Sequence, residues 1–318
     1  MPALSAQDVD RFYEQGFLVV EDVVPPERLE AVLDDIGRIA RRLASDHGAP
    51  SAEGSGWERE LMSLVKSTGK EFGQHFDISY PVRGHVDEQT PVNLSRGNFE
   101  VMIEPRLLDA VESIVGPEVF SNPVQHLRIK LPEGTLSPEA GFLSAMVPWH
   151  QDNGVVLAEA DETLLVTAWV AVTRATRENG CLRLIPRSHS SPILTHCLNV
   201  NQYEIPRHLV SQLGEPVDVE MNAGSVIFIH SRVVHASNHN VTEDEVRVSL
   251  DLRYQPTGEP TGRPWFPGFV ARSKADPASA LADYQTWVGL WKGAIPNLPD
   301  EFAPDDIFRW GPTGNVCA

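Results

Sequence analysis

The chain has 318 residues, of which 42% are hydrophobic and 22% charged, a composition typical of a globular protein with a sizeable core. Acidic residues outnumber basic ones by 44 to 26, and the resulting net charge of −18 repels polyanions, so we expect neither nucleic acid nor an anionic membrane as a partner. No apolar run approaches the ~20 residues of a membrane span, and the polar N-terminus lacks a secretory signal pattern.

The three cysteines are Cys181, Cys197 and Cys317. Their number is odd and no Cys-x-x-Cys pair occurs, so the sequence predicts no disulfide framework and fits a reducing compartment. Together with the absence of a signal pattern, this favours a cytoplasmic location.

Two helices with a strand between them are predicted at the start of the chain. The first helix covers residues 5–15, because Ser5 suits the N-cap, Asp8 follows three positions on, and Gly16 ends the pattern. Residues 16–24 form a β-rich run. The Pro-Pro pair at 25–26 then opens a second helix, whose apolar residues recur every three or four positions and predict one buried face: Leu29, Val32, Leu33, Ile36, Ile39 and Leu43.

The next segment, residues 45–100, loses this periodicity and is broken by Gly, Ser and Pro. It predicts a long irregular segment, and such loops inside a compact domain often form functional lids, so we expect it to border the substrate pocket. Residues 105–115 predict another short helix.

From about residue 118 the pattern turns to β. Residues 125–131 alternate, 165–172 and 225–230 are apolar runs, and 181–185 follow Asn179-Gly180, a strong hairpin signal. Residues 246–254 alternate strictly, with the polar side chains on one face: Arg247, Ser249, Asp251 and Arg253. We predict a mainly β fold with flanking helices, a sandwich or jelly roll in one domain (1–318), with its core at about 5–255 and a C-terminal extension at 256–318.

A His-x-Asp pair suits a metal site, because residues i and i+2 of a strand or tight turn point the same way. Two imidazoles and one carboxylate on one face of iron leave three positions open, as oxygen chemistry requires. Three such pairs occur, at 75/77, 85/87 and 150/152. Only His150 and Asp152 precede a long β run that can mount them rigidly, so we predict these as ligands. The other pairs are expected on surface loops, unless one lines the substrate mouth.

The third ligand is expected from a later strand, where His230, His235 and His239 are candidates. Arg247 lies 12 residues beyond His235 on the polar face of its strand, and an arginine can hold the distal carboxylate of a co-substrate through two hydrogen bonds. A polar arginine on a strand can equally face solvent, so the pattern alone leaves both options open.

Five motifs in this order resemble the phytanoyl-CoA dioxygenase family. They are Pro148-Trp-His-Gln-Asp152, Thr167-Ala-Trp-Val-Ala171, Glu178-Asn-Gly-Cys-Leu182 running on to Ile185-Pro-Arg-Ser-His189, Gly224-Ser-Val-Ile-Phe-Ile-His230, and His235-Ala-Ser237 with Arg247. The start of the chain, Phe12 to Val20, is also similar, and the resemblance spans roughly residues 5–255.

The resemblance implies a double-stranded β-helix, a cupin-like jelly roll with iron inside. It implies His150, Asp152 and His235 as the Fe(II) ligands and catalytic residues. It also implies four contacts to the co-substrate 2-oxoglutarate: Arg247, Ser237, Trp169 and Leu127.

The implied reaction uses O2 to hydroxylate, or otherwise oxidise, an unactivated C–H bond, with succinate and CO2 as co-products. Relatives that halogenate carry a small residue in place of the carboxylate, so Asp152 favours hydroxylation. The negative charge argues against a CoA ester, and we expect a small molecule such as a secondary metabolite or an amino-acid-like compound. Candidate substrate contacts are Asn153, Gln125 and His126.

Three other readings remain. A non-oxidative, metal-dependent cupin-type isomerase or lyase would share the jelly roll and the ligands but has no use for Arg247 and Ser237. A zinc hydrolase can use the same ligand set, although no HExxH helix occurs. A relative that has lost catalysis would not need to keep the intact triad. The sequence does not indicate an oligomeric state.

Overall fold

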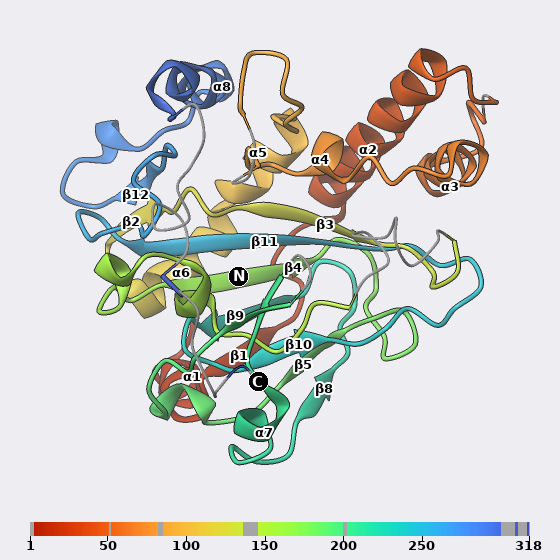
Figure 1. The fold of residues 1–318 in the computed structure, drawn as a ribbon. Coiled ribbons are helices and arrows are strands. Elements are labelled where there is room, and N and C mark those ends of the chain that lie inside the picture. The colour runs from red at the N-terminus through yellow and green to blue at the C-terminus, as the bar shows by residue number, and fades with distance from the viewer. Residues whose placement is uncertain are drawn as a thin grey trace.

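Two antiparallel β-sheets lie one above the other in the computed structural model, which describes residues 3–50, 52–81, 85–135, 146–199, 202–299, 309–310 and 317 (Figure 1). The larger sheet has seven strands, and β3 (His126–Lys130) pairs with β11 beside the main path. That path runs β1 (Phe17–Val20), β9 (Val226–His230), β4 (Val166–Ala171), β11 (Arg247–Pro256), β2 (Glu118–Ser121) and β12 (Phe269–Ser273).

The smaller sheet contains β10 (His235–Ser237), β5 (Leu182–Leu184) and β8 (Val217–Val219), and an isolated bridge joins His150 to His235 at its edge. A separate ribbon pairs β6 (Cys197–Asn199) with β7 (Gln202–Glu204). Two facing sheets of this kind form a jelly roll, so the predicted fold class is confirmed.

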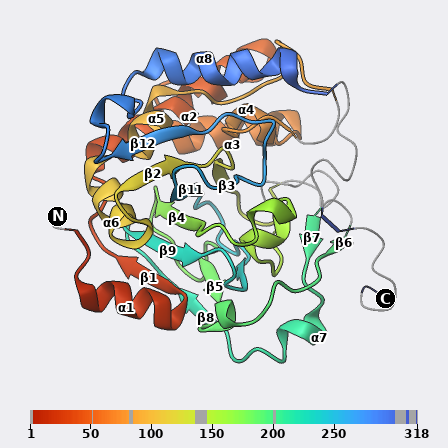
Figure 2. The ribbon, with the colours of Figure 1, turned by 90° about the vertical axis from the view of Figure 1, so that its left-hand side faces the viewer.

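Helices cover the outer face of the larger sheet and complete a three-layer arrangement (Figures 1 and 2). The covering helices are α2 (Pro26–Asp46), α3 (Trp57–Thr68), α4 (Gly73–Phe76), α5 (Arg96–Met102), α6 (Pro105–Val115) and α8 (Tyr284–Ala294). Helix α1 (Ala6–Gln15) lies beside β1, and α7 (Arg207–Val210) lies on the side of the smaller sheet. The predicted helices at 5–15 and 105–115 and the one opened by Pro25-Pro26 are confirmed, and Ser5 forms a reciprocal capping box with Asp8.

Strand β11 separates the hydrophobic core from the polar interior. Val248, Leu250 and Leu252 point into the core beneath the helices. Arg247, Asp251 and Arg253 alternate with them and line a cavity on the opposite face, between the sheets. The predicted alternation is confirmed, and the polar face is directed inward rather than toward solvent.

The prediction of an irregular segment at 45–100 is wrong, because α3 and α4 lie within it and α5 begins in it. In α3, Leu61, Leu64 and Val65 are fully buried against α2, so tertiary packing stabilises the helix. The flanking Gly54 and Gly56, both at positive φ, obscured this short apolar stripe in the sequence.

Two further expectations need correction. The segment after 256 is not merely an extension, because β12 pairs with β2 in the larger sheet and α8 buries Trp287 and Trp291 in the main core. Asn179-Gly180 makes a turn but no hairpin, because β5 pairs with β10 and β8 rather than with the preceding β4. The turn carries the chain from the larger sheet to the smaller one.

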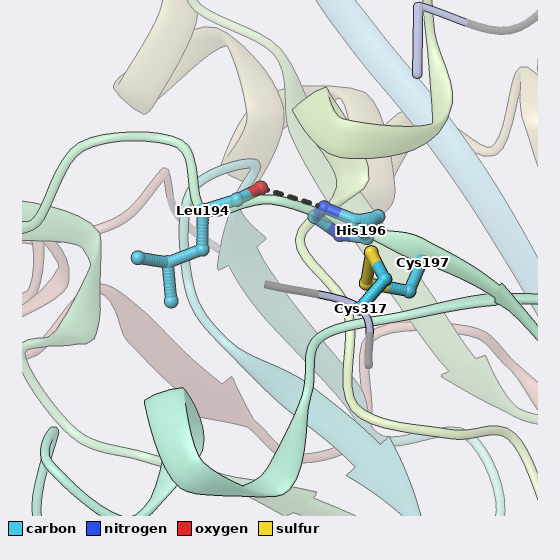
Figure 3. Close-up of a disulfide and its surroundings, with 4 residues drawn as sticks. All are labelled: Leu194, His196, Cys197 and Cys317. Carbon is cyan, nitrogen blue, oxygen red and sulfur yellow. Dashed lines mark hydrogen bonds between the residues drawn. A yellow bond between two sulfur atoms is a disulfide. The ribbon is translucent and has the colours of Figure 1, made fainter. Parts of the chain in front are cut away.

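A disulfide joins Cys197 at the start of β6 to Cys317 near the C-terminus (Figure 3). The expectation of a chain without disulfides is therefore wrong for this pair, whose members are 120 residues apart and share no recognisable spacing. Cys181 is free and buried, and burial raises the pKa of its thiol.

In the described part of the chain no helix is long and apolar enough to cross a membrane.

If α8 belongs to the core, Trp287→Ala should lower the free energy of unfolding by about 3–5 kcal/mol, because it empties a fully buried site. Leu290→Ala on the same helix is the matched control, since that side chain is 37% exposed and should cost well under half as much. Denaturant unfolding of both variants measures the difference. Equal, small effects would show that α8 does not contribute to the core.

Candidate active site

Three potential metal ligands converge between the two sheets. The ligand atoms of His150, Asp152 and His235 lie within 4.8 Å of one another. His150 and His235 are held by their main chains, because each N–H donates to the other's carbonyl, at 2.9 and 3.0 Å. Asp152 follows at the start of a 3-10 turn (Asp152–Val155), which directs its carboxylate to the same point. The structure therefore selects the 150/152 pair and His235 from the candidates.

Each imidazole is oriented by a backbone carbonyl. His150 Nδ1 lies 2.9 Å from the Pro148 carbonyl and His235 Nδ1 lies 3.0 Å from that of Val233. A carbonyl only accepts, so both Nδ1 atoms carry the proton and both Nε2 lone pairs are free to bind a metal. Burial, followed by the neighbouring His235, lowers the pKa of His150 to about 3, which keeps that imidazole neutral at pH 7.

The carboxylate of Asp152 is fully buried and held at both oxygens. Arg253 Nη2 donates to Oδ1 at 2.5 Å, and Thr167 Oγ1 donates to Oδ2 at 2.5 Å. Burial opposes ionisation, but the charge and the hydrogen bond of Arg253 outweigh it, so the pKa of Asp152 is lowered well below its usual value. The site thus offers an ionised, oriented carboxylate beside two imidazoles, the donor set suited to non-haem iron.

A second cluster, which we call the cationic end of the site, consists of Ser237, Lys130 and Arg247. Ser237 lies two residues after His235 on β10, so the two side chains point the same way. Ser237 Oγ accepts from Lys130 Nζ at 2.6 Å and from the Val147 amide at 2.9 Å. Lys130 on β3 is the cross-strand partner of Arg247 on β11, so both cations share the inward face. Arg247 also lies over the ring of Trp169, with its guanidinium carbon 5.4 Å from the centroid.

Both cations of this end are buried without a counter-ion in the described part of the chain. Lys130 is 3% exposed and Arg247 2% exposed, and their donors reach only hydroxyl and carbonyl oxygens. Arg247 Nε has no hydrogen-bond partner. Burial, and then the charge of Arg247, lowers the pKa of Lys130 well below its usual value. Two adjacent buried cations form a receptor for a carboxylate.

One cavity of about 630 Å³ connects the triad and the cationic end, and its walls also include segment 71–81 and strand β3. That volume is in the range of small-molecule sites.

A profile of the phytanoyl-CoA dioxygenase (PhyH) family matches residues 12–249 of this chain. The chain belongs to the phytanoyl-CoA dioxygenase family. The resemblance predicted from the five motifs is thereby confirmed, and the matched range contains the triad and the cationic end.

Curated relatives include bovine peroxisomal phytanoyl-CoA dioxygenase (24% identical, covering 73% of this chain and 64% of the relative) and the ectoine dioxygenase of Bordetella parapertussis (24%, covering 76% and 72%). The chain thus spans less than two thirds of the length of the bovine enzyme.

Solved structures share the fold at 16–21% identity. They include the non-haem monooxygenase ThoJ (TM-score 0.55, covering 91% of this chain and 97% of that one) and the epimerase SnoN with Fe3+ and alpha ketoglutarate (0.53, 80% and 86%). HygX from Streptomyces hygroscopicus, with nickel and 2-oxoglutarate bound, gives 0.50 (80% and 88%).

The structure brings only some of the predicted contacts to the cavity. Ser237, Trp169, Arg247 and His126 line it. Leu127 also borders the cavity but belongs to the main hydrophobic core, because alternation along β3 turns its neighbours inward instead.

Asn153 and Gln125 are fully buried away from the cavity. The Asn153 amide donates to the Ala160 carbonyl at 3.1 Å, and the Gln125 amide bonds main-chain groups, including the Arg253 amide at 3.2 Å. Both side chains stabilise neighbouring main-chain segments, and neither lines the cavity in which a substrate would bind.

The other histidine candidates lie away from the triad. His239 pairs with Glu133 at the surface, and His230 accepts from the Arg232 amide. His85 and Asp87 are exposed, as expected for a loop. Asp77, from the pair at 75/77, does line the cavity, so the expectation that one of these pairs could reach the substrate mouth is met.

Sequence reasoning missed three residues that the structure places at the site: Lys130, Thr167 and Arg253. The alternation of β3 and β11 put Lys130 and Arg253 on the polar faces, and Thr167 opens a quoted motif. No local signal showed which partner each would meet, because the partners are 15 to 107 residues away in the chain.

The C-terminal part of the chain packs behind the ligand-bearing turn. Trp310 donates to the Gly154 carbonyl at 2.5 Å and stacks on His196, whose Nε2 accepts from the Gln151 amide at 2.9 Å. Figure 3 shows His196 beside the disulfide of Cys197. A Cβ on Gly154 would lie 2.0 Å from the His196 ring, so this close packing requires glycine.

Thr167→Val keeps the side-chain shape but removes the hydrogen bond that orients Asp152, so metal affinity should fall about tenfold. Competition between the protein and a chromogenic chelator for Co(II) measures the change. Thr163→Val is the matched control, because Thr163 is equally buried and donates only to the Pro260 carbonyl. A loss of affinity in the control equal to that in Thr167→Val would contradict an orienting role.

Proposed function

We propose that this protein is an Fe(II)- and 2-oxoglutarate-dependent dioxygenase that oxidises an unactivated C–H bond of a small polar molecule. The observation that carries the proposal is one cavity with a His-Asp-His triad at one place and, at another, two buried cations that have no counter-ion among the described residues. Membership of the phytanoyl-CoA dioxygenase family supports the same chemistry.

The donor set fits iron. His150 and His235 would bind through Nε2, the nitrogen that their backbone hydrogen bonds leave free, and Asp152 would bind through its carboxylate. Because Arg253 and Thr167 already hold both oxygens of that carboxylate, its orientation is set before a metal arrives. Three protein ligands leave positions open for a chelating co-substrate and oxygen.

The cationic end fits the distal carboxylate of 2-oxoglutarate. Arg247 and Lys130 supply the charge, the Ser237 hydroxyl lies between β10 and β3, and the unpartnered Arg247 Nε marks an unused donor. Binding a dicarboxylate there would satisfy two desolvated cations at once, which makes the site selective for an acidic co-substrate. Trp169 confines the guanidinium from one side.

When bound, iron and 2-oxoglutarate would activate O2, which is the oxidant, and succinate and CO2 would be the co-products. The chain's own contribution is positioning and exclusion of water. The triad and cationic end lie between two sheets, and the residues that hold them are almost completely buried. Segment 71–81 forms another part of the cavity wall, and the cavity has room for a substrate beside the triad.

A non-oxidative, cupin-type isomerase or lyase is the second candidate, and one observation keeps it in view: a protein of the same fold is an epimerase with bound Fe3+ and alpha ketoglutarate. An enzyme that works without a co-substrate would not need the cationic end, but that epimerase is itself alpha ketoglutarate dependent, so dependence on 2-oxoglutarate alone does not exclude epimerisation. Product analysis then distinguishes an alcohol from an epimer.

The proposal predicts that Arg247→Met will weaken 2-oxoglutarate binding at least about tenfold, because the mutation removes a charge-assisted, bidentate contact from a buried site. Isothermal titration of zinc-loaded protein, which does not turn over, measures the affinity directly. Lys130→Met should weaken binding in the same direction, through loss of the second buried charge.

Arg272→Met provides the control, because Arg272 lies on β12 and pairs with Asp109 and Glu112 outside the cavity. Unchanged 2-oxoglutarate affinity in both Arg247→Met and Lys130→Met would contradict the co-substrate assignment. Succinate release by the iron-loaded wild type, dependent on O2, would confirm the oxidative reaction class.

A further inference from the structure

A half-buried histidine–aspartate pair lies in the cavity and has no part in holding the metal or the co-substrate. His126 Nδ1 lies 3.0 and 3.1 Å from the two carboxylate oxygens of Asp77, and both residues line the cavity. Their side chains remain about one fifth exposed, 21% and 19%, so the pair faces open space rather than the packed core.

Asp77 is rigidly mounted. Its Oδ1 accepts from the Ile78 amide at 2.8 Å, and its carbonyl accepts from the Asn93 amide at 2.7 Å. The next turn is fixed by Ser79, whose hydroxyl donates to the Gln125 carbonyl at 2.8 Å. These bonds join the segment before α5 to strand β3, so the carboxylate has little freedom to leave His126.

This arrangement fixes which nitrogen of His126 carries the proton. An ionised carboxylate cannot donate, so Nδ1 must be protonated and Nε2 must present a lone pair. Burial lowers the pKa of His126, an effect that Asp77 opposes and the charges of Arg128 and Arg253 reinforce, so the imidazole is neutral at pH 7. Nε2 has no hydrogen-bond partner in the described part of the chain.

The pair is close to the reacting centre. His126 is the cross-strand partner of Asp251 on β11, and Asp251 lies one inward-facing position from Arg253, which bonds the ligand Asp152. Asp251 is paired with Arg128 at 3.4 Å. A substrate beside the triad therefore meets a wall on which His126 Nε2 offers an acceptor. Two neighbouring atoms of the same wall also lack hydrogen-bond partners among the described residues: Asp251 Oδ1, an acceptor, and Arg253 Nε, a donor.

We propose that His126, oriented by Asp77, anchors the substrate by accepting a hydrogen bond from a hydroxyl or ammonium group. This inference rests on the proposed function and narrows its substrate class: a polar molecule with a hydrogen-bond donor near the oxidised carbon, rather than an apolar acyl chain. An apolar substrate would leave His126 Nε2 desolvated without a partner, which is costly.

The test uses three six-membered-ring probes that the cavity easily holds: cyclohexanol, cyclohexylammonium and the acceptor-only cyclohexanone. Their dissociation constants are measured by saturation-transfer NMR on the wild type loaded with zinc and 2-oxoglutarate. Cyclohexanol, cyclohexylammonium or both should bind about tenfold more tightly than cyclohexanone, the size expected of one good hydrogen bond at a desolvated site. Which of the two binds better distinguishes a hydroxyl from an ammonium substrate.

Asp77→Asn is the most informative variant, because it should reverse the hydrogen-bonding role of His126 Nε2. The Asn oxygen can keep the Ile78 bond while its NH2 group faces His126, which forces the proton from Nδ1 to Nε2. The imidazole then becomes a donor, and the preference should invert toward cyclohexanone. His126→Leu should abolish the preference altogether. Asp87→Asn is the matched control, because Asp87 forms a similar turn with Gln89 on the exposed surface.

Equal affinities for the three probes in the wild type would overturn this inference, and so would a preference that Asp77→Asn leaves unchanged. Titration of 2-oxoglutarate into the same zinc-loaded samples separates this failure from a failure of the proposed function. If 2-oxoglutarate binds normally while the probes show no preference, only the substrate anchor is wrong. If 2-oxoglutarate does not bind the wild type, the oxygenase assignment itself is wrong.

Discussion

The buried ion pair between Asp152 and Arg253 is the interaction on which the rest of the site depends. A carboxylate that is fully removed from water is stable only with a compensating charge and good hydrogen bonds. Arg253 supplies the charge and Thr167 the second hydrogen bond, and together they set the direction of the carboxylate. The imidazoles of His150 and His235 converge on the same point because their main chains are bridged to each other.

This constraint explains why the larger sheet has a polar inner face. Strand β11 carries Arg253 for the metal ligand and Arg247 for the cationic end, while its alternate residues seal the helical core. One strand thus fixes the spacing between the two functional clusters. Strand β3 repeats the pattern beside it, with His126 and Lys130 inward and Leu127 and Ile129 in the core.

Much of this could be predicted from sequence, wherever the signal is local. His150 and Asp152 stood out because a rigid strand follows them, and the alternation of 246–254 gave the correct faces of β11. Contacts made across the fold gave no local signal. Lys130 meets Ser237 107 residues away, and the two disulfide-bonded cysteines are 120 residues apart. Short helices such as α3 are stabilised by packing against α2 rather than by a long local pattern. Because glycines interrupt the sequence just before α3, its apolar stripe was not recognised.

The central claim is that one cavity holds iron and 2-oxoglutarate together. The most direct test is an anaerobic titration of the metal-free protein, first with Fe(II) and then with 2-oxoglutarate, followed by visible absorption. The account predicts a weak charge-transfer band that appears only when both are present. Iron binding without such a band at any concentration of 2-oxoglutarate would contradict it and would favour a non-oxidative metal enzyme.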